Sequence, residues 1–246
     1  MKTKMRLDLL VQERYPELTR NFIQSLIMQG HVRVEGQPVT KAGMQIASDS
    51  EIELVHETPK YVSRAGFKLE GALDEFGIDP TGMVVMDAGL STGGFTDCLL
   101  QRGAAKIYGV DVGYGQVHEK IRADARVVVM ERVNLRTMDA LPELVDLVTL
   151  DLSFISVLKV IETVKKLLKP QGRLIVLIKP QFEAERYEVG KGGIIKDAAV
   201  HQRVLDHVIE GIKHQGFIFH RVIDSPIKGT DGNKEFLAYF TLGEGE

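Results

Sequence analysis

The sequence Asp87-Ala-Gly-Leu-Ser-Thr-Gly-Gly-Phe-Thr-Asp97 connects a short apolar run at 84–86 to an expected helix at 96–101. An acidic residue at the end of a buried strand, followed by small residues and a helix, is typical of an open α/β sheet. Such sheets bind ligands outside the carboxyl ends of their strands. Glycine lets the backbone of the loop turn tightly and approach the ligand closely. The segment therefore predicts a doubly wound α/β fold with a ligand site at this loop.

The same loop narrows the choice of ligand. A dinucleotide-binding G-x-G-x-x-G motif needs glycine where this chain has Ser91, and no G-x-x-x-x-G-K-[ST] phosphate-binding motif occurs. Asp87 can attract an ammonium group, and Asp111, at the end of the next expected strand, can accept both hydroxyls of a ribose. S-adenosylmethionine, an adenosine that carries an amino group, suits both carboxylates. The alternative is that the glycines only turn the chain and that Asp111 caps a helix.

Strand and helix signals alternate over most of the chain. Buried-looking strands are expected at 84–86, 106–110, 127–130, 145–150 and 173–178, and helices at 65–76, 96–101, 157–168 and 198–214. This alternation indicates a mostly parallel sheet with helices on both faces. The strand-like segments 217–223 and 236–241 have no helix between them, so we expect them to pair antiparallel at one edge. The expected fold is α/β, with a mostly parallel seven-stranded sheet whose last strand is antiparallel.

A smaller unit precedes this domain. Apolar residues at helical spacing fall within 18–29, with Thr19 as the expected N-cap and Gly30 at the end. The segments 31–36 and 51–54 then alternate like half-buried strands, and the first runs into an expected turn at 35–37. A small α+β unit is therefore expected at the N-terminus.

Pro59 and its polar neighbours indicate a linker at 58–63. This boundary divides the chain into a small domain at 1–57 and the α/β domain at 64–246. A length of 246 residues agrees with two domains.

Composition limits the class of protein. The residues are 44% hydrophobic and 26% charged, with a net charge of −3, which excludes collagen, a coiled coil and global disorder. The single Cys98 provides neither an internal disulfide nor a cysteine-based zinc site, so we expect a cytoplasmic protein without a metal. No apolar run reaches the roughly 20 residues of a membrane span, and residues 1–20 lack the apolar core of a signal peptide.

Three further segments follow residues 87–97 along the chain. They are Gly109-Val-Asp-Val-Gly-Tyr-Gly-Gln116, Leu150-Asp-Leu-Ser-Phe-Ile-Ser156 and Ile178-Lys-Pro-Gln-Phe-Glu183. Together, and in this order, the four segments resemble the TlyA (hemolysin-A-like) ribosomal RNA methyltransferases, relatives of the FtsJ ribose methyltransferases. The resemblance covers almost the whole chain and implies a Rossmann-like methyltransferase that binds S-adenosylmethionine.

The resemblance also implies which residues bind the cofactor. They are Gly89, Ser91, Gly93, Phe95, Asp111 and Asn134. Two of them depart from related patterns: Phe95 replaces the tryptophan of FtsJ enzymes, and Asn134 replaces the acid that many methyltransferases place near the adenine. The ring of Phe95 can still pack against the ligand, and the amide of Asn134 can still contact the adenine.

Four charged residues occupy positions where packing alone would favour apolar or turn residues: Lys68, Asp151, Lys179 and Glu235. Asp151 and Lys179 directly follow the expected strands 145–150 and 173–178, so both side chains should face the mouth of the ligand site. Charges there are costly unless they are paired. The four residues resemble the Lys-Asp-Lys-Glu tetrad of FtsJ-type ribose 2'-O-methyltransferases.

The chemistry of methyl transfer explains these residue types. A ribose 2'-hydroxyl is a poor nucleophile at neutral pH, so its oxygen must be positioned and its proton removed. We expect Lys179 to be the general base, since burial and the nearby charge of Lys68 favour its neutral form. Asp151 and Glu235 would orient the lysines, while Lys68 tunes the charge or holds a ribose or phosphate. The alternative is two ordinary ion pairs at the sheet edge.

The small unit resembles an S4 RNA-binding domain, through Arg6-Leu-Asp-Leu-Leu10, Thr19-Arg20, the run at 26–36 and Lys41. Residues 1–47 carry seven Lys or Arg against four acids, a local excess that the overall charge of −3 conceals. We expect RNA phosphate contacts from Arg6, Arg20, Arg33 and Lys41. A solvated charged helix face is the alternative.

The expected function is S-adenosylmethionine-dependent 2'-O-methylation of cytidine ribose in ribosomal RNA within ribosomal subunits, as the resemblance implies. A basic segment at 185–196 beside the expected site either clamps the RNA backbone or is an ordinary solvated loop. Two other functions stay open. One is a noncatalytic ribosome-binding assembly factor with a vestigial pocket. The other is membrane lysis, which only the hemolysin name of the family suggests.

Overall fold

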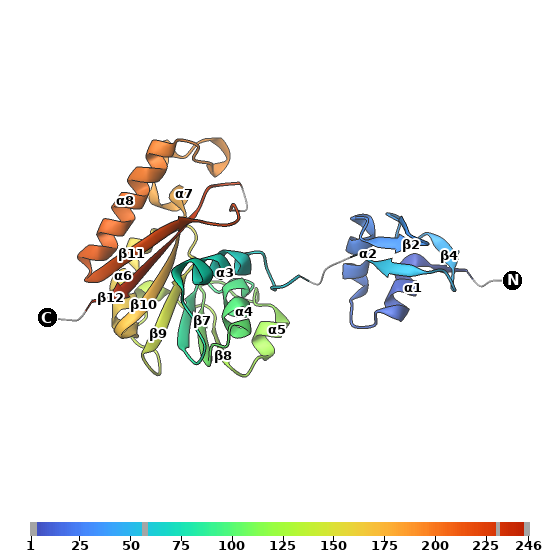
Figure 1. Cartoon of the computed structure of the whole chain (residues 1–246), viewed down its shortest axis with the longest axis horizontal. Coiled ribbons are helices and arrows are strands. Elements are labelled where there is room, and N and C mark those ends of the chain that lie inside the picture. Colours follow the sequence, from blue (N-terminus) through green and yellow to red (C-terminus); the bar gives the residue numbers. More distant parts are fainter. Residues whose placement is uncertain (1–3, 56–58, 230–231, 244–246) are drawn as a thin grey trace. The chain divides into compact units, whose positions relative to one another are not determined.

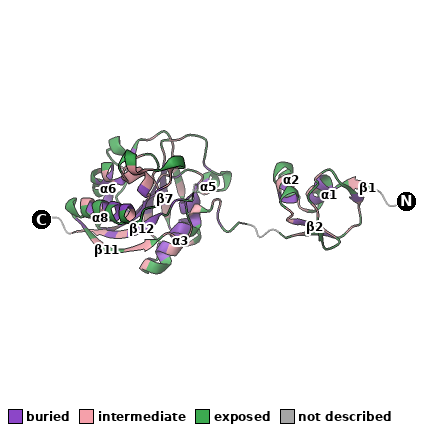
Figure 2. Cartoon of the chain, turned by 90° about the horizontal axis from the view of Figure 1, so that it is seen from above, coloured by how far each residue is buried: buried purple, intermediate pink, exposed green. Residues whose placement is uncertain are grey.

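The chain forms two units, Met1–Lys60 and Tyr61–Glu246. The structure is a computed structural model that describes residues 4–55, 59–229 and 232–243. Each unit encloses its own hydrophobic core, and buried residues gather in the middle of each unit (Figure 2). Within the described ranges, no helix has the length and apolar character that a membrane span requires.

The first unit packs two helices against short strands. Its elements are β1 (Lys4–Arg6), α1 (Leu7–Arg14), α2 (Arg20–Met28), β2 (Val32–Val34), β3 (Gln37–Pro38), β4 (Gln45–Ala47) and β5 (Ile52–Leu54). The hydroxyl of Thr19 accepts the backbone N–H of Phe22, which confirms Thr19 as the N-cap of α2. The strands pair in the order β3-β2-β5, and β1 pairs with β4.

The expected strand at 31–36 spans Val32–Val34, and the turn expected at 35–37 is confirmed. Glu35 and Gly36 have positive φ angles of 50° and 75°, so the chain turns after Val34 and returns as β3. This geometry is that of a tight hairpin, in which two consecutive left-handed residues match the twist of the strands.

The second unit contains a seven-stranded sheet of order β11-β12-β10-β9-β6-β7-β8. Its strands are β6 (Val84–Ala88), β7 (Lys106–Val110), β8 (Val127–Met130), β9 (Val145–Leu150), β10 (Leu168–Ile178), β11 (Phe217–Asp224) and β12 (Phe236–Leu242). The strands from β10 to β8 are parallel, and β12 runs antiparallel to both of its neighbours. The expected fold class is therefore confirmed, including the antiparallel last strand.

Helices cover both faces of this sheet (Figure 1). They are α3 (Ala65–Phe76), α4 (Gly94–Gln101), α5 (Glu119–Ala123), α6 (Ile161–Leu167), α7 (Pro180–Glu183) and α8 (Ala198–His214). Successive strand residues point to opposite faces. Val85 and Leu147 join the core under α3, α4 and α5, whereas Met86 and Val148 join the core under α6 and α8.

The expected helix at 157–168 is divided in two. A 3-10 turn at Val157–Lys159 precedes α6, and α6 ends at Leu167. The end has a local cause, because Lys169 precedes Pro170 and a residue before proline is disfavoured in the helical region. The next strand consequently begins at Leu168 rather than at Arg173, with a register irregularity between these two residues.

The expected linker at 58–63 is shorter than the sequence suggests. Residues 56–58 lie outside the described residues. Tyr61 is only 3% exposed and donates a hydrogen bond from its hydroxyl to Glu70 of α3 (3.0 Å). The backbone N–H of Val62 donates to Asp97 of α4 (2.8 Å). Residues 61–63 are therefore part of the second unit.

Candidate active site

The loop between β6 and α4 requires glycine at two close approaches. Gly89 has φ 91°, and a Cβ at this position would overlap the carbonyl oxygen of Asp151. A Cβ on Gly94 would overlap the hydroxyl of Ser63, just before α3. Because glycine has no Cβ, the end of β9 and the residues just before α3 can pack directly against the loop.

Ser91 takes a left-handed conformation, with φ 48°, where a dinucleotide-binding loop would have glycine. Its backbone N–H donates to Oδ2 of Asp111 (2.7 Å), and the N–H of Gly113 donates to Oδ1 (2.7 Å). The carboxylate of Asp111 therefore ties the loop after β6 to the loop after β7. Each of its oxygens keeps a lone pair for a further donor.

Two adjoining cavities open at the carboxyl ends of the strands. The larger, about 370 Å³, is lined by Gly89, Ser91, Asp111, Asn134, Asp151 and Phe154, among others. The smaller, about 70 Å³, lies beside the start of α3 and is lined by Ser63, Ala65, Leu90, Thr92, Gly94 and Phe95 in addition to Gly89, Ser91 and Asp151. The three shared residues join the cavities into one site of the size that a nucleoside ligand needs.

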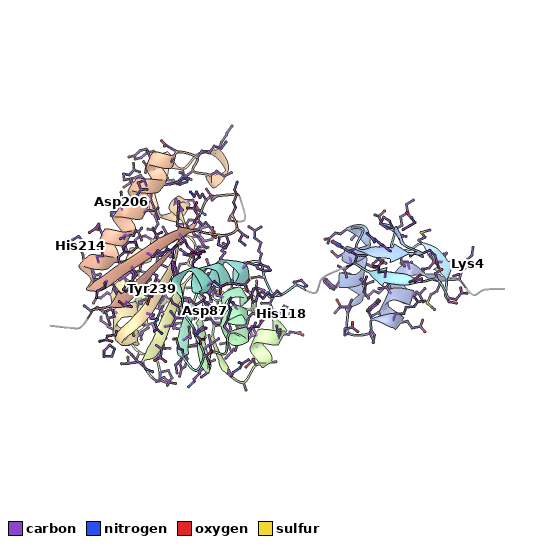
Figure 3. All side chains as sticks on the ribbon, viewed as in Figure 1. Lys4, Asp87, His118, Asp206, His214 and Tyr239 are labelled. Carbon is purple, nitrogen blue, oxygen red and sulfur yellow. The ribbon has the colours of Figure 1, made fainter. Side chains whose placement is uncertain are left out.

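Two of the expected cofactor residues line neither cavity. Asp87 lies in the interior of the second unit (Figure 3), fully buried, and accepts hydrogen bonds from the hydroxyls of Thr96 (2.6 Å) and Thr149 (2.9 Å). Burial raises the pKa of this carboxyl to about 6. Gly93 has φ 100° as the residue before α4, and its backbone faces Ile121. Both residues support the loop from the side that faces away from the cavities.

The other expected cofactor residues lie at the cavities. Phe95 is 3% exposed and contributes to the wall of the smaller cavity. Asn134 lines the larger cavity, where its side-chain oxygen accepts the N–H of Arg136 (3.0 Å) and so leaves its amide nitrogen available as a donor.

The sheet register brings three of the four expected catalytic residues to one edge. Asp151 follows β9, Lys179 follows β10, and Glu235 precedes β12. Because Ile178 pairs with Phe236 across the antiparallel ladder, the start of β12 lies beside the end of β10. The backbone N–H of Asp151 also bonds to Ala88, directly before the glycine loop (2.9 Å).

The four charged side chains form two close ion pairs. Nζ of Lys179 lies 2.6 Å from Oδ1 of Asp151 and donates to the hydroxyl of Ser153 (3.0 Å). Nζ of Lys68, on α3, donates to Oε2 of Glu235 (2.5 Å), and these two side chains are only 9% and 3% exposed. Of the four, Asp151 lines both cavities, so the Lys179 pair is at the cavity edge.

Sequence reasoning missed three residues of the site. Ser63 lines the smaller cavity, and the only sequence signal for it is its position two residues before α3. Phe154 lines the larger cavity, with φ 65° and 90% of the residue exposed, and its ring lies 5.0 Å from that of Phe182. An aromatic residue just after a strand-end acid is a signal for such a position. Asn233, two residues before Glu235, is 2% exposed.

The expected RNA-binding side chains of the first unit are half-exposed or exposed. Arg6 donates to Oδ1 of the fully buried Asp8 (3.0 Å) and Arg20 to Oδ2 (3.1 Å). Hydrogen bonds from Arg6 above all hold the pKa of Asp8 well below its usual range. Arg33 lies 3.8 Å from Glu53, and Lys41 is exposed. Asp8 thus holds two arginines from different elements with their outer faces in solvent.

Comparison with known proteins identifies the family. Residues 61–242 match the model of the FtsJ-like methyltransferase family, and residues 5–52 match the S4 domain. Hemolysin A of Brachyspira hyodysenteriae is 44% identical over 97% of this chain and 100% of its own length. The 16S/23S rRNA (cytidine-2'-O)-methyltransferase TlyA of Mycobacterium tuberculosis is 37% identical over 97% of this chain and 90% of its own. The chain belongs to the TlyA group of FtsJ-like methyltransferases.

Solved structures agree with this membership. A structure from Streptococcus thermophilus is 37% identical, with 99% of this chain and 90% of that one covered and a TM-score of 0.75. An S-adenosylmethionine-dependent methyltransferase from Mesorhizobium loti, 16% identical, shares the fold over 71% of this chain and 97% of its own (TM-score 0.54). The resemblance drawn from the sequence, to an enzyme family with an S4 domain, is confirmed.

Proposed function

We propose that this TlyA-group enzyme transfers the methyl group of S-adenosylmethionine to the 2'-hydroxyl of a cytidine in ribosomal RNA, within ribosomal subunits in the cytoplasm. One observation carries the proposal: the Lys179–Asp151 ion pair lies at the edge of a nucleoside-sized cavity, beside the buried Lys68–Glu235 pair. The names of the TlyA relatives support the choice of cytidine and ribosomal RNA.

The cavity residues fit the proposed cofactor. The free lone pairs of Asp111 suit the two hydroxyls of a ribose, and the amide of Asn134 suits the acceptor nitrogens of adenine. The smaller cavity, with the Ser63 hydroxyl and the start of α3, suits the amino-acid end. S-adenosylmethionine, when bound, supplies a methyl group on a positively charged sulfur. We propose that Asp87 acts by holding the loop through Thr96 and Thr149.

The charged side chains have distinct proposed roles. The ammonium of Lys179 that pairs with Asp151 first releases a proton to solvent, and the resulting amine then accepts the proton of the ribose 2'-hydroxyl. Asp151 holds Nζ of Lys179 at the cavity edge, and Ser153 fixes it from a second direction. Glu235 holds Lys68, whose positive charge favours the oxygen anion that develops as the proton leaves.

Two further features suit an RNA substrate. The exposed ring of Phe154 offers a face on which a base can stack at the mouth of the cavity. In the first unit, Arg6 and Arg20 share the buried carboxylate of Asp8, which orders two guanidinium groups for phosphate contacts before RNA binds.

The test is methyl transfer to isolated ribosomal subunits with Lys179→Ala. We expect a loss of at least about 100-fold in the rate, because removal of a general base costs about 10²- to 10⁴-fold. Lys166→Ala is the matched control, since Lys166 forms an exposed ion pair with Glu162 on α6. Full activity of the Lys179 variant would remove it as the base.

Calorimetry with S-adenosylmethionine separates this proposal from the noncatalytic alternative. An assembly factor with a vestigial pocket would not bind the cofactor, whereas the enzyme binds it with or without Lys179. Asp111→Ala is expected to abolish binding, because it removes both the ribose acceptor and the tie between the two loops.

A further inference from the structure

Asn233 is a buried polar residue in the turn between β11 and β12, two residues before Glu235. It is 2% exposed, and both ends of its amide are bonded to backbone. Its Oδ1 accepts the N–H of Ile195 (3.1 Å), and its Nδ2 donates to the carbonyl of Gly193 (2.9 Å). A buried amide bonded at both ends fixes the two segments relative to each other, since either bond is costly to lose without water.

The turn that Asn233 belongs to encloses the carboxylate of Glu235. The carbonyl of Asn233 accepts the N–H of Gly229 (2.9 Å), and the carbonyl of Glu235 accepts the N–H of Ser225 (2.9 Å). Gly229 lies so close to Glu235 that a Cβ there would be 2.5 Å from Oε1. The position of the turn therefore determines the position of the carboxylate.

The other partners of Asn233 form a fixed support. Ile195 is 3% exposed and packs in the core under α8, just before that helix begins. Gly193 belongs to a short 3-10 turn in the basic segment 185–196. On the opposite side, Arg64 donates to the carbonyl of Lys228, so the same turn is also tied to the start of α3, which carries Lys68.

We propose that Asn233 is a positioning residue of the catalytic site. It fixes the turn against Gly193 and Ile195. This turn holds the Glu235 carboxylate where it accepts a hydrogen bond from Lys68. Loss of its amide lets Glu235 withdraw and Lys68 follow it, while the cofactor cavity keeps its lining because Asn233 contributes nothing to that lining. This inference rests on the proposed function.

The experiment measures the single-turnover rate of methyl transfer to ribosomal subunits, and cofactor affinity by calorimetry. For Asn233→Ala we expect a rate about 10- to 100-fold lower, the size of effect that a misplaced catalytic group produces, with cofactor affinity and the KM for subunits unchanged. In the Glu235→Gln background, Asn233→Ala is expected to cause no further loss, because it acts through the carboxylate that is already neutralised.

Asp146→Ala is the matched control for general loss of stability. Asp146 accepts the backbone N–H of Val84 (2.9 Å) at the opposite end of the strands, so its loss also frees a backbone group. It is expected to lower the melting temperature without changing the single-turnover rate. Asn233→Ser, which keeps an acceptor for Ile195, provides a second variant and should lose less rate than Asn233→Ala.

Three results would overturn the inference. One is an equal loss from Asn233→Ala in the native and Glu235→Gln backgrounds. Another is a native rate for a folded Asn233→Ala. The third is that Asn233→Ala and Asn233→Ser both lose cofactor binding and also lose a cooperative melting transition, which would indicate general unfolding. If Glu235→Gln itself retains the native rate, it is instead the proposed tetrad that fails.

Discussion

The carboxylate of Asp87 accepts hydrogen bonds from two threonines inside the protein, and the residue lies where the sequence predicts it. Its position at the end of a buried strand was predictable from the apolar run before it. Its partners were not, because Thr149 is 62 residues away on a neighbouring strand and reaches Asp87 only in the folded sheet. Both carboxylate oxygens are thereby satisfied inside the protein, away from the cavities.

The burial of Asp87 predicts a pH dependence of stability. The unfolded carboxyl ionises near pKa 3.8, whereas the folded one ionises near 6. Between these values the folded state holds a proton that the unfolded state has lost. The free energy of unfolding therefore falls as the pH rises from about 4 to about 6, by about 3 kcal/mol, and stays lower above that range.

Urea unfolding of the native chain and of Asp87→Asn, from pH 4 to pH 8, measures this contribution. The asparagine does not titrate, so its free energy of unfolding relative to the native chain should rise through this window and then level off. Thr96→Ser, which keeps the hydroxyl bonded to Asp87, should behave like the native chain. Parallel curves for native and Asp87→Asn would contradict the assigned pKa.

The sequence predicts a functional position at Glu235 but not at Asn233. A glutamate at the start of an apolar strand is unusual enough to be noticed. An asparagine after glycine is an ordinary turn residue, and local sequence gives no sign that its amide is buried. Its role depends on Gly193 and Ile195, which only the tertiary structure brings to it.

At the scale of elements, the strands of the second unit were predicted closely because each is a short apolar run between turn residues. The segments 106–110, 127–130 and 145–150 agree at both ends with β7, β8 and β9. The start of the second unit was misplaced. Tyr61 looks like part of a polar linker until α3 and α4 provide Glu70 and Asp97 as hydrogen-bond partners for residues 61 and 62.

The contact between the start of α3 and the glycine loop predicts the effect of Gly94→Ala. The added Cβ would overlap the Ser63 hydroxyl and crowd Ala65, so α3 must move away from the smaller cavity. We expect cofactor affinity to fall by about tenfold or more, equivalent to about 1.4 kcal/mol, measured by calorimetry.

Gly211→Ala is the control for this substitution. It lies in α8, where the added methyl group meets only the flexible end of Leu158. It should leave cofactor affinity unchanged. Equal affinities for Gly94→Ala and the native chain would show that the start of α3 does not shape the cofactor site.

At the scale of the whole molecule, each unit has its own core, and the two differ in charge. The net charge of −3 averages an N-terminal excess of basic residues with an acidic remainder. A chain that begins at Lys60 keeps Tyr61 and the complete second core. It is therefore expected to melt cooperatively and to bind S-adenosylmethionine with native affinity.

The same truncated chain should methylate ribosomal subunits poorly, with a raised KM. Its KM should also depend less on salt, because each lost phosphate contact removes about one unit from the slope of log affinity against log salt. Arg6→Ala with Arg20→Ala in the full chain should reproduce part of this change. An equal KM and salt dependence for both chains would mean that the S4 unit does not hold the substrate.

The reversed direction of β12 has a consequence for how this fold accommodates different substrates. Parallel strands reach the edge that carries Asp151 and Lys179 only at their ends, and the connections after β6, β7, β9 and β10 lead from that edge into α4, α5, α6 and α7. The β11–β12 hairpin instead turns at that edge, and the described residues of its turn form no helix. A change of length at this hairpin that keeps the bonds of Ser225, Gly229 and Asn233 would therefore reshape the rim of the site without displacing a helix.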